Sequence, residues 1–121
     1  MQEAAAVITL YGIPNCDTVK KARVWLAQNH VNFTFHDFRK DGLNAATVEA
    51  WCHRINWETL VNKRSTTWKT LDEATRQTLC RENVSALLAA HPTLIKRPVL
   101  ETPNTLEVGF NADLYQPIFA A

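Results

Sequence analysis

Residues 7–38 read VITLYGIPNCDTVKKARVWLAQNHVNFTFHDF, and this stretch decides the fold class. Residues 7–11 are β-branched and aromatic and stop at the turn formers GIPN, which predicts a short buried strand and a loop. Apolar side chains then recur every three or four residues and predict a helix over about 17–29. Residues 31–38 alternate in polarity and predict a second strand. A strand-helix-strand unit of this length favours parallel pairing of its strands.

The rest of the chain predicts a helical section, then a hairpin and a last helix. A polar break at residues 39–42 ends the first unit, and helical patterns then dominate about fifty residues. The helices expected there cover about 44–55, 72–81 and 85–90, with a further turn at 57–60. Residues 99–101 and 106–109 flank a Pro-Asn turn and predict a hairpin, and Asn111 opens a helix toward Phe119.

The amino-acid composition and net charge disfavour several classes of partner and compartment. The chain has 121 residues, of which 46% are hydrophobic, so one compact domain is expected. Lys and Arg number 13 against 12 Asp and Glu, and a net charge of +1 argues against nucleic acid and anionic membrane partners. No apolar stretch is long enough to span a bilayer, and the N-terminus lacks the features of an export signal. Three cysteines, an odd number, favour a reducing compartment, so we expect a cytoplasmic protein. We also expect a monomer.

Cys16 falls between the turn and the first predicted helix. A side chain there lies near unpaired backbone N–H groups and the positive end of the helix dipole. That environment lowers the pKa of a thiol and makes it a nucleophile. Lys20 and Lys21 add positive potential, whereas Asp17 opposes it. The alternative is that a small residue merely fits a tight turn, and spacing alone leaves both interpretations open.

The other cysteines and the histidines predict no metal site. Cys52 and Cys80 lie in predicted helices beside apolar neighbours, so we expect buried, unreactive thiols. No Cys or His pair has the spacing of metal ligands. His30, His36 and His91 are scattered along the chain, which favours solvated or core-edge imidazoles over a Cys–His dyad.

Two arginines lie in segments that could face a ligand. Arg64 belongs to residues 61–69, VNKRSTTWK, whose hydroxyl side chains are typical of a loop that holds an oxyanion or carboxylate. The alternative there is a solvent-facing charge run. Arg97 precedes Pro98 at the start of the third strand. This proline either simply begins the strand or forms a cis bond that presents the preceding backbone to a ligand.

Three motifs together resemble the ArsC/Spx/YffB family, and the similarity is greatest to its YffB-like branch. They are YGIPNCDTVKKA at residues 11–22, NKRS at 62–65 and IKRPV at 95–99, and they occur in the family's order. The resemblance covers about residues 8–119. It implies an α/β, thioredoxin-like fold with an all-helical insertion between the second and third strands. Residues 1–121 would then form a single ArsC-like domain, with its core at 1–40 and 93–121 and its insertion at 41–92.

The resemblance also implies roles for individual residues. Cys16 matches the family's nucleophilic cysteine, Arg64 the arginine of the helical insertion, and Arg97 the arginine before the cis-proline, here Pro98. Asn15, next to the cysteine, joins Arg64, Arg97 and Pro98 in the set expected to bind substrate or glutathione. In arsenate-reducing members the cysteine attacks the oxyanion, arginines stabilise its charge, and glutathione with glutaredoxin resolves the adduct.

The chain departs from the family's patterns at three places. Arsenate reductases carry a third arginine after the cis-proline, but no Lys or Arg follows Arg97 here. Gly12 and Ile13 replace polar residues of the active-site loop. Each lost charged hydrogen bond would forfeit about 2–4 kcal/mol of transition-state stabilisation. Val19 stands where Spx-type regulators often have a second cysteine, so Cys16 would need an external resolving thiol.

These observations support three functional hypotheses. The leading one is a glutathione-dependent monothiol reductase in which Cys16 forms a mixed disulfide with glutathione. Glutathione would be a co-substrate, no cofactor or metal would be bound, and the substrate would be a small oxidised molecule or a protein disulfide. The second is arsenate reduction coupled to glutathione and glutaredoxin. The third is an Spx-like regulator that binds RNA polymerase without catalysis.

Overall fold

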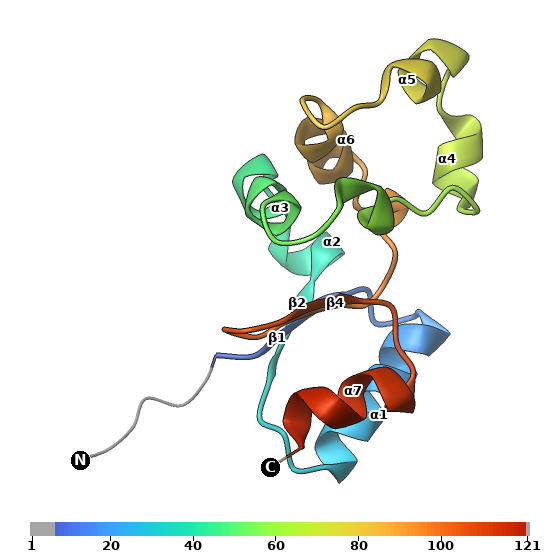
Figure 1. Ribbon diagram of the computed structural model, residues 1–121. Helices are drawn as coiled ribbons and strands as arrows, with labels where there is room; N and C mark the ends of the chain where they lie inside the picture. Colours follow the sequence, from blue (N-terminus) through green and yellow to red (C-terminus); the bar gives the residue numbers. More distant parts are fainter. Residues whose placement is uncertain (1–6, 121) are drawn as a thin grey trace. The chain divides into compact units, whose positions relative to one another are not determined.

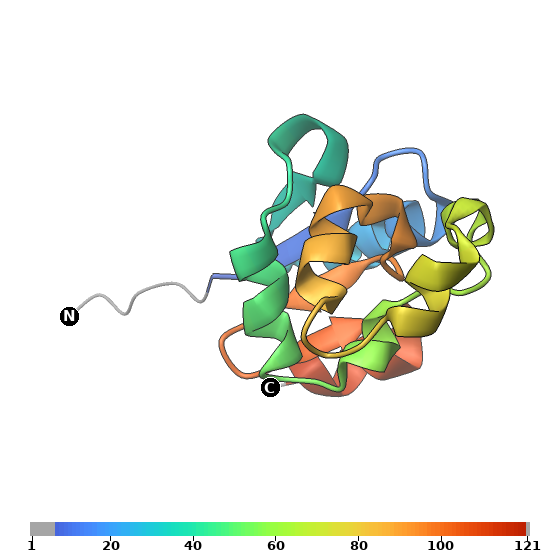
Figure 2. The ribbon, with the colours of Figure 1, turned by 90° about the horizontal axis from the view of Figure 1, so that it is seen from above.

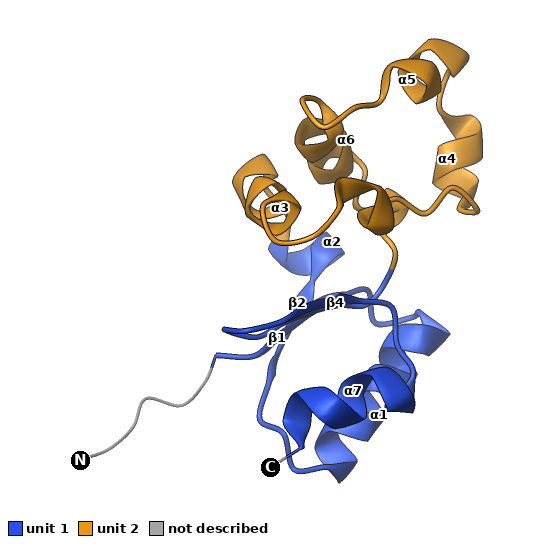
Figure 3. Ribbon diagram, in the orientation of Figure 1, with its two compact units in different colours: residues 1–41, 97–121 blue, residues 42–96 orange. Residues whose placement is uncertain are grey.

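The computed structural model describes residues 7–120, and the chain divides into two compact units (Figure 3). Residues 42–96 make up the second unit. The first unit combines the chain before residue 42 with the chain from residue 97 onward. The first unit therefore holds both termini of the fold, and the helical segment is inserted between its second and third strands.

The first unit is built on a four-stranded sheet in the order β2-β1-β3-β4 (Figure 1). Its strands are β1 Thr9–Gly12, β2 Thr34–Asp37, β3 Val99–Glu101 and β4 Leu106–Val108. β1 pairs with β2 in parallel and with β3 antiparallel, and β3 pairs antiparallel with β4. The strand-helix-strand unit, the hairpin and the mixed α/β class predicted from the sequence are confirmed.

Two helices cover one face of this sheet, α1 (Asp17–Gln28) and α7 (Ala112–Phe119) (Figure 1). Their apolar stripes meet the inward side chains of β1 and β3, because residues of one strand alternate between its two faces. The fully buried members of this core are Leu10, Ala22, Leu26, Leu100 and Tyr115. The core fixes the direction of α1, and with it the place where that helix begins.

The second unit is helical, apart from an isolated antiparallel bridge between Val61 and Ile95. It comprises α3 Ala45–Cys52, α4 Thr66–Thr70, α5 Glu73–Thr78, α6 Val84–Ala90 and two 3-10 helices, Trp57–Leu60 and Pro92–Leu94. α3 packs against α6 (Figure 2), and the buried Val48 and Trp51 of α3 belong to this unit's core with Val84 and Leu88 of α6. No helix within residues 7–120 has the length and apolar character needed to cross a bilayer.

Several local predictions were wrong. The helix expected over 72–81 ends at Thr78 and leaves Cys80 outside it, and β2 begins only at Thr34. Polar capping explains the start of α4 and the end of β2. The sequence predicted a loop through residue 69, but the Ser65 hydroxyl accepts the Trp68 N–H and starts α4 at Thr66. The second strand was expected over 31–38, but β2 ends at Asp37. The Asp37 carboxylate accepts the N–H of Arg39, and the chain turns into the short helix α2, Phe38–Asp41.

Candidate functional site

The turn between β1 and α1 is held by close packing of Gly12 against Val19. A Cβ on Gly12 would lie 2.7 Å from Cγ2 of Val19, which is completely buried. Only glycine allows the strand end to approach the first turn of the helix this closely. Gly12 is therefore required by this close contact and not by a positive φ angle. The contact explains why glycine stands where the family's arsenate reductases have a polar residue.

Cys16 is the N-cap residue of α1. Its backbone is extended, with φ −98° and ψ 125°, and its carbonyl oxygen accepts the N–H of Lys20 at 2.9 Å. The side chain is half-buried and makes no capping hydrogen bond of standard geometry. The sulfur nevertheless lies at the end of the helix where unpaired N–H groups favour a negative charge.

The sheet brings Arg97 to Cys16. β3 pairs with β1 so that Val99 lies opposite Tyr11, which places the residues before β3 beside the chain that leaves β1. Arg97 is joined to Pro98 by a cis peptide bond, as the resemblance implied. The carbonyl oxygen of Pro98 accepts the N–H of Gly109 at 2.8 Å, which ties this segment to the hairpin. The half-buried Arg97 side chain forms a hydrogen bond with the Cys16 thiol.

Opposing effects set the pKa of Cys16. Burial of the thiol raises the pKa and is the largest single effect. The pKa is lowered by hydrogen bonds from the backbone N–H groups of Val19 and Thr18. It is also lowered by the hydrogen bond and the charge of Arg97. Together they outweigh burial, and the pKa of Cys16 lies below its ordinary value. The shifted pKa and the partial exposure are the two properties that a reactive thiol needs.

The remaining predicted residues lie in different surroundings. Asn15 is exposed in the loop directly before Cys16, in the first unit. Arg64 belongs to the second unit and is exposed. The side-chain oxygen of Asn62 accepts its backbone N–H at 3.0 Å, just before the N-cap of α4. Within the first unit, the structure therefore brings together Cys16, Arg97 and Pro98 and places Asn15 next to them in the chain.

Cys52 has a different environment, which the sequence did not predict. Arg81 donates to both carboxylate oxygens of Glu49 at 2.9 and 2.7 Å, and Ser85 donates to the same carboxylate at 2.8 Å. Burial raises the pKa of Cys52, against the opposing effects of a Ser85 hydrogen bond and the Arg81 charge. Both Cys52 and Cys80 are half-buried rather than fully buried as expected. Arg81 lies in the turn before α6 and Glu49 lies on α3, so no local spacing in the sequence signals this cluster.

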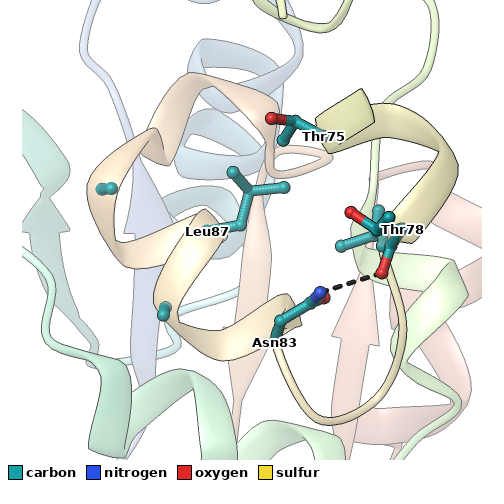
Figure 4. A pocket seen from close by; sticks show the side chains of 7 residues that line it. Thr75, Thr78, Asn83 and Leu87 are labelled. Carbon is teal, nitrogen blue, oxygen red and sulfur yellow. Dashed lines mark hydrogen bonds between the residues drawn. The ribbon is translucent and has the colours of Figure 1, made fainter. Parts of the chain in front are cut away.

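A cavity of about 350 Å³ lies within the second unit, between α5 and α6 (Figure 4). Its wall includes Thr75, Thr78 and Leu87, and the Asn83 amide donates to the Thr78 carbonyl at 2.9 Å. None of its lining residues is titratable, so it offers no group for acid or base chemistry. Residues 7–120 contain no group of three or more His, Cys, Asp or Glu side chains that could hold a metal ion. The pair of Cys16 and Arg97 remains the candidate site.

Comparison with known proteins shows the family to which this chain belongs. The model of the ArsC family matches residues 11–118. An uncharacterized protein of Haemophilus influenzae is 46% identical over 114 residues, covering 94% of this chain and 100% of the relative. The solved structure of a YffB protein superposes with a TM-score of 0.89 at 40% identity, covering 94% of this chain and 100% of the other.

A more distant relative has a regulatory name. The global transcriptional regulator Spx 1 of Bacillus cereus is 25% identical over 109 residues, covering 88% of this chain and 82% of the relative. The matched region includes both the thioredoxin-like sheet and the helical insertion. The chain therefore belongs to the ArsC family, with Spx and YffB proteins among its relatives and a thioredoxin-like fold.

Proposed function

We propose that this protein is a glutathione-dependent monothiol reductase with Cys16 as its nucleophile. The observation that carries the proposal is the hydrogen bond between Arg97 and a half-buried thiol at the N-cap of α1, whose pKa is lowered. A thiolate at neutral pH is the reactive form in thiol–disulfide exchange. The fold and the family membership are consistent with this chemistry.

The proposed reaction has two exchange steps. In the first, the Cys16 thiolate attacks the glutathionyl sulfur of a mixed disulfide between glutathione and a substrate thiol. A Cys16–glutathione disulfide forms and the substrate thiol leaves. In the second, the thiolate of another glutathione attacks this disulfide, which releases oxidised glutathione and restores the Cys16 thiolate. In total one glutathione thiol is consumed: its sulfur and the transferred glutathionyl sulfur leave as oxidised glutathione, and the substrate sulfur is released as a thiolate that takes a proton from solvent.

We assign the remaining predicted residues to binding. Arg97 would stabilise the Cys16 thiolate, and its guanidinium would also hold a carboxylate of glutathione. Asn15 and Pro98, which flank the nucleophile and Arg97 in the chain, would contact the glutathione peptide. The resemblance assigns Arg64 a similar role. If that role is right, Arg64→Lys raises the KM for glutathione more than it lowers kcat, because lysine cannot make a bidentate contact.

Mass spectrometry after incubation with oxidised glutathione tests the assignment of the nucleophile. Wild-type protein should gain one glutathione, and peptide mapping should place it on Cys16. Cys52→Ser and Cys80→Ser variants serve as matched controls and should gain the same adduct, whereas Cys16→Ser should not. Adducts confined to Cys52 or Cys80 would refute the proposal.

Two alternatives rest on separate observations. The family membership keeps arsenate reduction in consideration, but three acidic and no basic residues follow Arg97, which disfavours binding of an oxyanion there. A coupled assay that finds no arsenate-dependent turnover would remove it.

The Spx relative favours a polymerase-binding regulator. Val19 weighs against an Spx-type dithiol switch, because it stands where those regulators often have their second cysteine. Failure to co-purify with RNA polymerase would weaken this alternative further.

A further inference from the structure

An open apolar groove of about 400 Å³ runs along α1 and ends at the segment that leads into α7. Val24, Trp25, Phe110 and Ala112 form its apolar wall. The Trp25 ring meets Tyr115 at 5.6 Å and the Phe110 ring meets the same tyrosine at 4.8 Å, so the buried core holds both rings in place. Val24 is 55% exposed, although the opposite side of the helix is fully buried.

The groove has a positive rim. Lys20 and Lys21 line its end nearest the start of α1, and neither amine has an ion-pair partner among the described residues. An apolar surface bordered by unpaired amines is complementary to an apolar side chain flanked by carboxylates. Free glutathione has carboxylates but no large apolar group, so a segment of another protein fits the groove better.

The groove also lies close to the proposed nucleophile along the helix. Cys16, Lys20 and Val24 are spaced by four residues, so they follow one side of α1. Eight residues of helix span about 12 Å. An extended chain covers about 3.3 Å per residue, so four residues of a substrate would bridge the distance from the sulfur to the groove.

We propose that this groove recruits glutathionylated protein substrates through an acidic segment with an apolar side chain about four residues from the modified cysteine. This inference rests on the proposed function, because it names the substrate class for Cys16. The protein would then act on glutathionylated proteins in preference to small mixed disulfides. The apolar side chain would contact Val24 and Phe110, and its neighbouring carboxylates would lie near Lys20 and Lys21.

Three glutathionylated peptides test the recruitment: Ac-EFEGGC-amide, Ac-KFKGGC-amide and Ac-EGEGGC-amide. The first should release its thiol at least about tenfold faster than the second at low ionic strength, and the ratio should fall in 0.5 M salt. The third, without its aromatic ring, should be several-fold slower than the first. Equal rates for all three peptides would overturn the inference.

Two variants localise the effect. Val24→Ser should remove the advantage of the phenylalanine, and Lys21→Glu should remove the advantage of the acidic residues. Lys40→Glu makes the same charge change on α2 and should leave the peptide preference intact. The mixed disulfide of glutathione with 2-mercaptoethanol should react equally fast with wild type, Val24→Ser and Lys40→Glu. If Val24→Ser slows this small substrate as much as the peptide, the groove binds glutathione itself and the inference fails.

A binding measurement separates recruitment from chemistry. In Cys16→Ser protein, the reduced peptide Ac-EFEGGC-amide should shift the NMR signals of the Val24 methyls and the Trp25 indole N–H. If these shifts appear but the wild-type protein reduces no mixed disulfide, the groove is supported and the reductase proposal is contradicted. Turnover of the small disulfide without these shifts would support the reductase and overturn the groove. Sedimentation of the wild-type protein should show a monomer. A dimer that is lost in Val24→Ser would instead mean that a second copy of the chain occupies the groove, and it would overturn the inference.

Discussion

Cys16 and Cys52 are two half-buried thiols, each with an arginine close by, yet their pKa values shift in opposite directions. Burial is the largest influence on both and raises both pKa values. The difference therefore arises from the polar groups around each sulfur. Neither exposure nor the presence of a nearby cation is enough to distinguish a reactive thiol from an inert one.

The polar groups at the two sulfurs differ. The Val19 N–H lowers the pKa of Cys16 most, ahead of Arg97. The Ser85 hydrogen bond lowers the pKa of Cys52 most, ahead of Arg81. Arg81 donates to both oxygens of Glu49, and the Glu49 charge raises the pKa of Cys52, against the effect of Arg81. Arg97 forms a hydrogen bond with the Cys16 thiol itself, and backbone N–H groups at the start of α1 act in the same direction. A cation activates a thiol when its hydrogen bonds point at the sulfur and a carboxylate does not offset its charge.

Replacing Arg97 should have the largest effect on this contrast. We expect Arg97→Ala to raise the pKa of Cys16 and to slow its alkylation by iodoacetamide about tenfold at pH 7, since a hydrogen bond to a charged group is lost. Arg81→Ala is the matched control and should leave Cys16 unchanged while raising the pKa of Cys52. The pH dependence of alkylation at each cysteine, followed by mass spectrometry, measures both. An unchanged midpoint at Cys16 would remove Arg97 from the proposed site.

Adding one methyl group at Gly12 should disturb Cys16 without reaching Cys52. The new Cβ would clash with Val19, and overpacking of this kind costs about 1–3 kcal/mol. We expect Gly12→Ala to lower the denaturant midpoint of unfolding and to slow Cys16 alkylation several-fold, because the first turn of α1 must move. The double variant Gly12→Ala/Val19→Ala restores the space and should recover part of the Cys16 reactivity. Cys52 should alkylate at the wild-type rate in both.

Much of this arrangement could be predicted from the sequence, because its signals are local. The turn formers before Cys16 and the apolar period after it specify the strand, the helix and the N-cap position. The residues around Pro98 left a cis bond open, and only the resemblance of the motif IKRPV to the family implied it. The start of α4 could not be predicted because a run of hydroxyl residues is as typical of a loop as of a cap, and only the Ser65 hydrogen bond decides it.

The environments of the thiols were harder to predict, since they depend on contacts between distant parts of the chain. Glu49 and Arg81 are 32 residues apart and meet only because α3 packs on α6. Likewise, the sequence indicated the direction of the Cys16 pKa shift, but the amount of burial that opposes it follows from the tertiary structure. A sequence pattern thus identifies a candidate nucleophile, and the packing around it determines its reactivity.

Removing the Glu49 charge should make Cys52 resemble Cys16 more closely. In Glu49→Gln, the negative charge that raises the Cys52 pKa is lost while Arg81 stays. We expect a lower Cys52 pKa and alkylation a few-fold faster at pH 8, with no change at Cys16. A Cys52 rate that does not change would mean that burial alone keeps this thiol inert.

The same variant should change the acid stability of the protein. Hydrogen bonds from Arg81 and then Ser85 lower the pKa of Glu49 to about 2, from an ordinary value of 4.5. A carboxyl with a depressed pKa stabilises the fold above its unfolded pKa, and this stability is lost as the pH falls from 4.5 toward 2. Glu49→Gln should be less stable than wild type at pH 7 and should lose less stability over that range. Urea unfolding at several pH values measures the difference.

The smallest effect is expected at Asp17, the neighbour of Cys16 in the chain. Its carboxylate is exposed in the first turn of α1, where water and salt screen its repulsion of the thiolate. Asp17→Asn should therefore change the Cys16 alkylation rate by less than about twofold at physiological salt, and by somewhat more in low salt. A change as large as that of Arg97→Ala would show that general surface charge controls Cys16. The directed hydrogen bonds that distinguish Cys16 from Cys52 would then not be the cause of its reactivity.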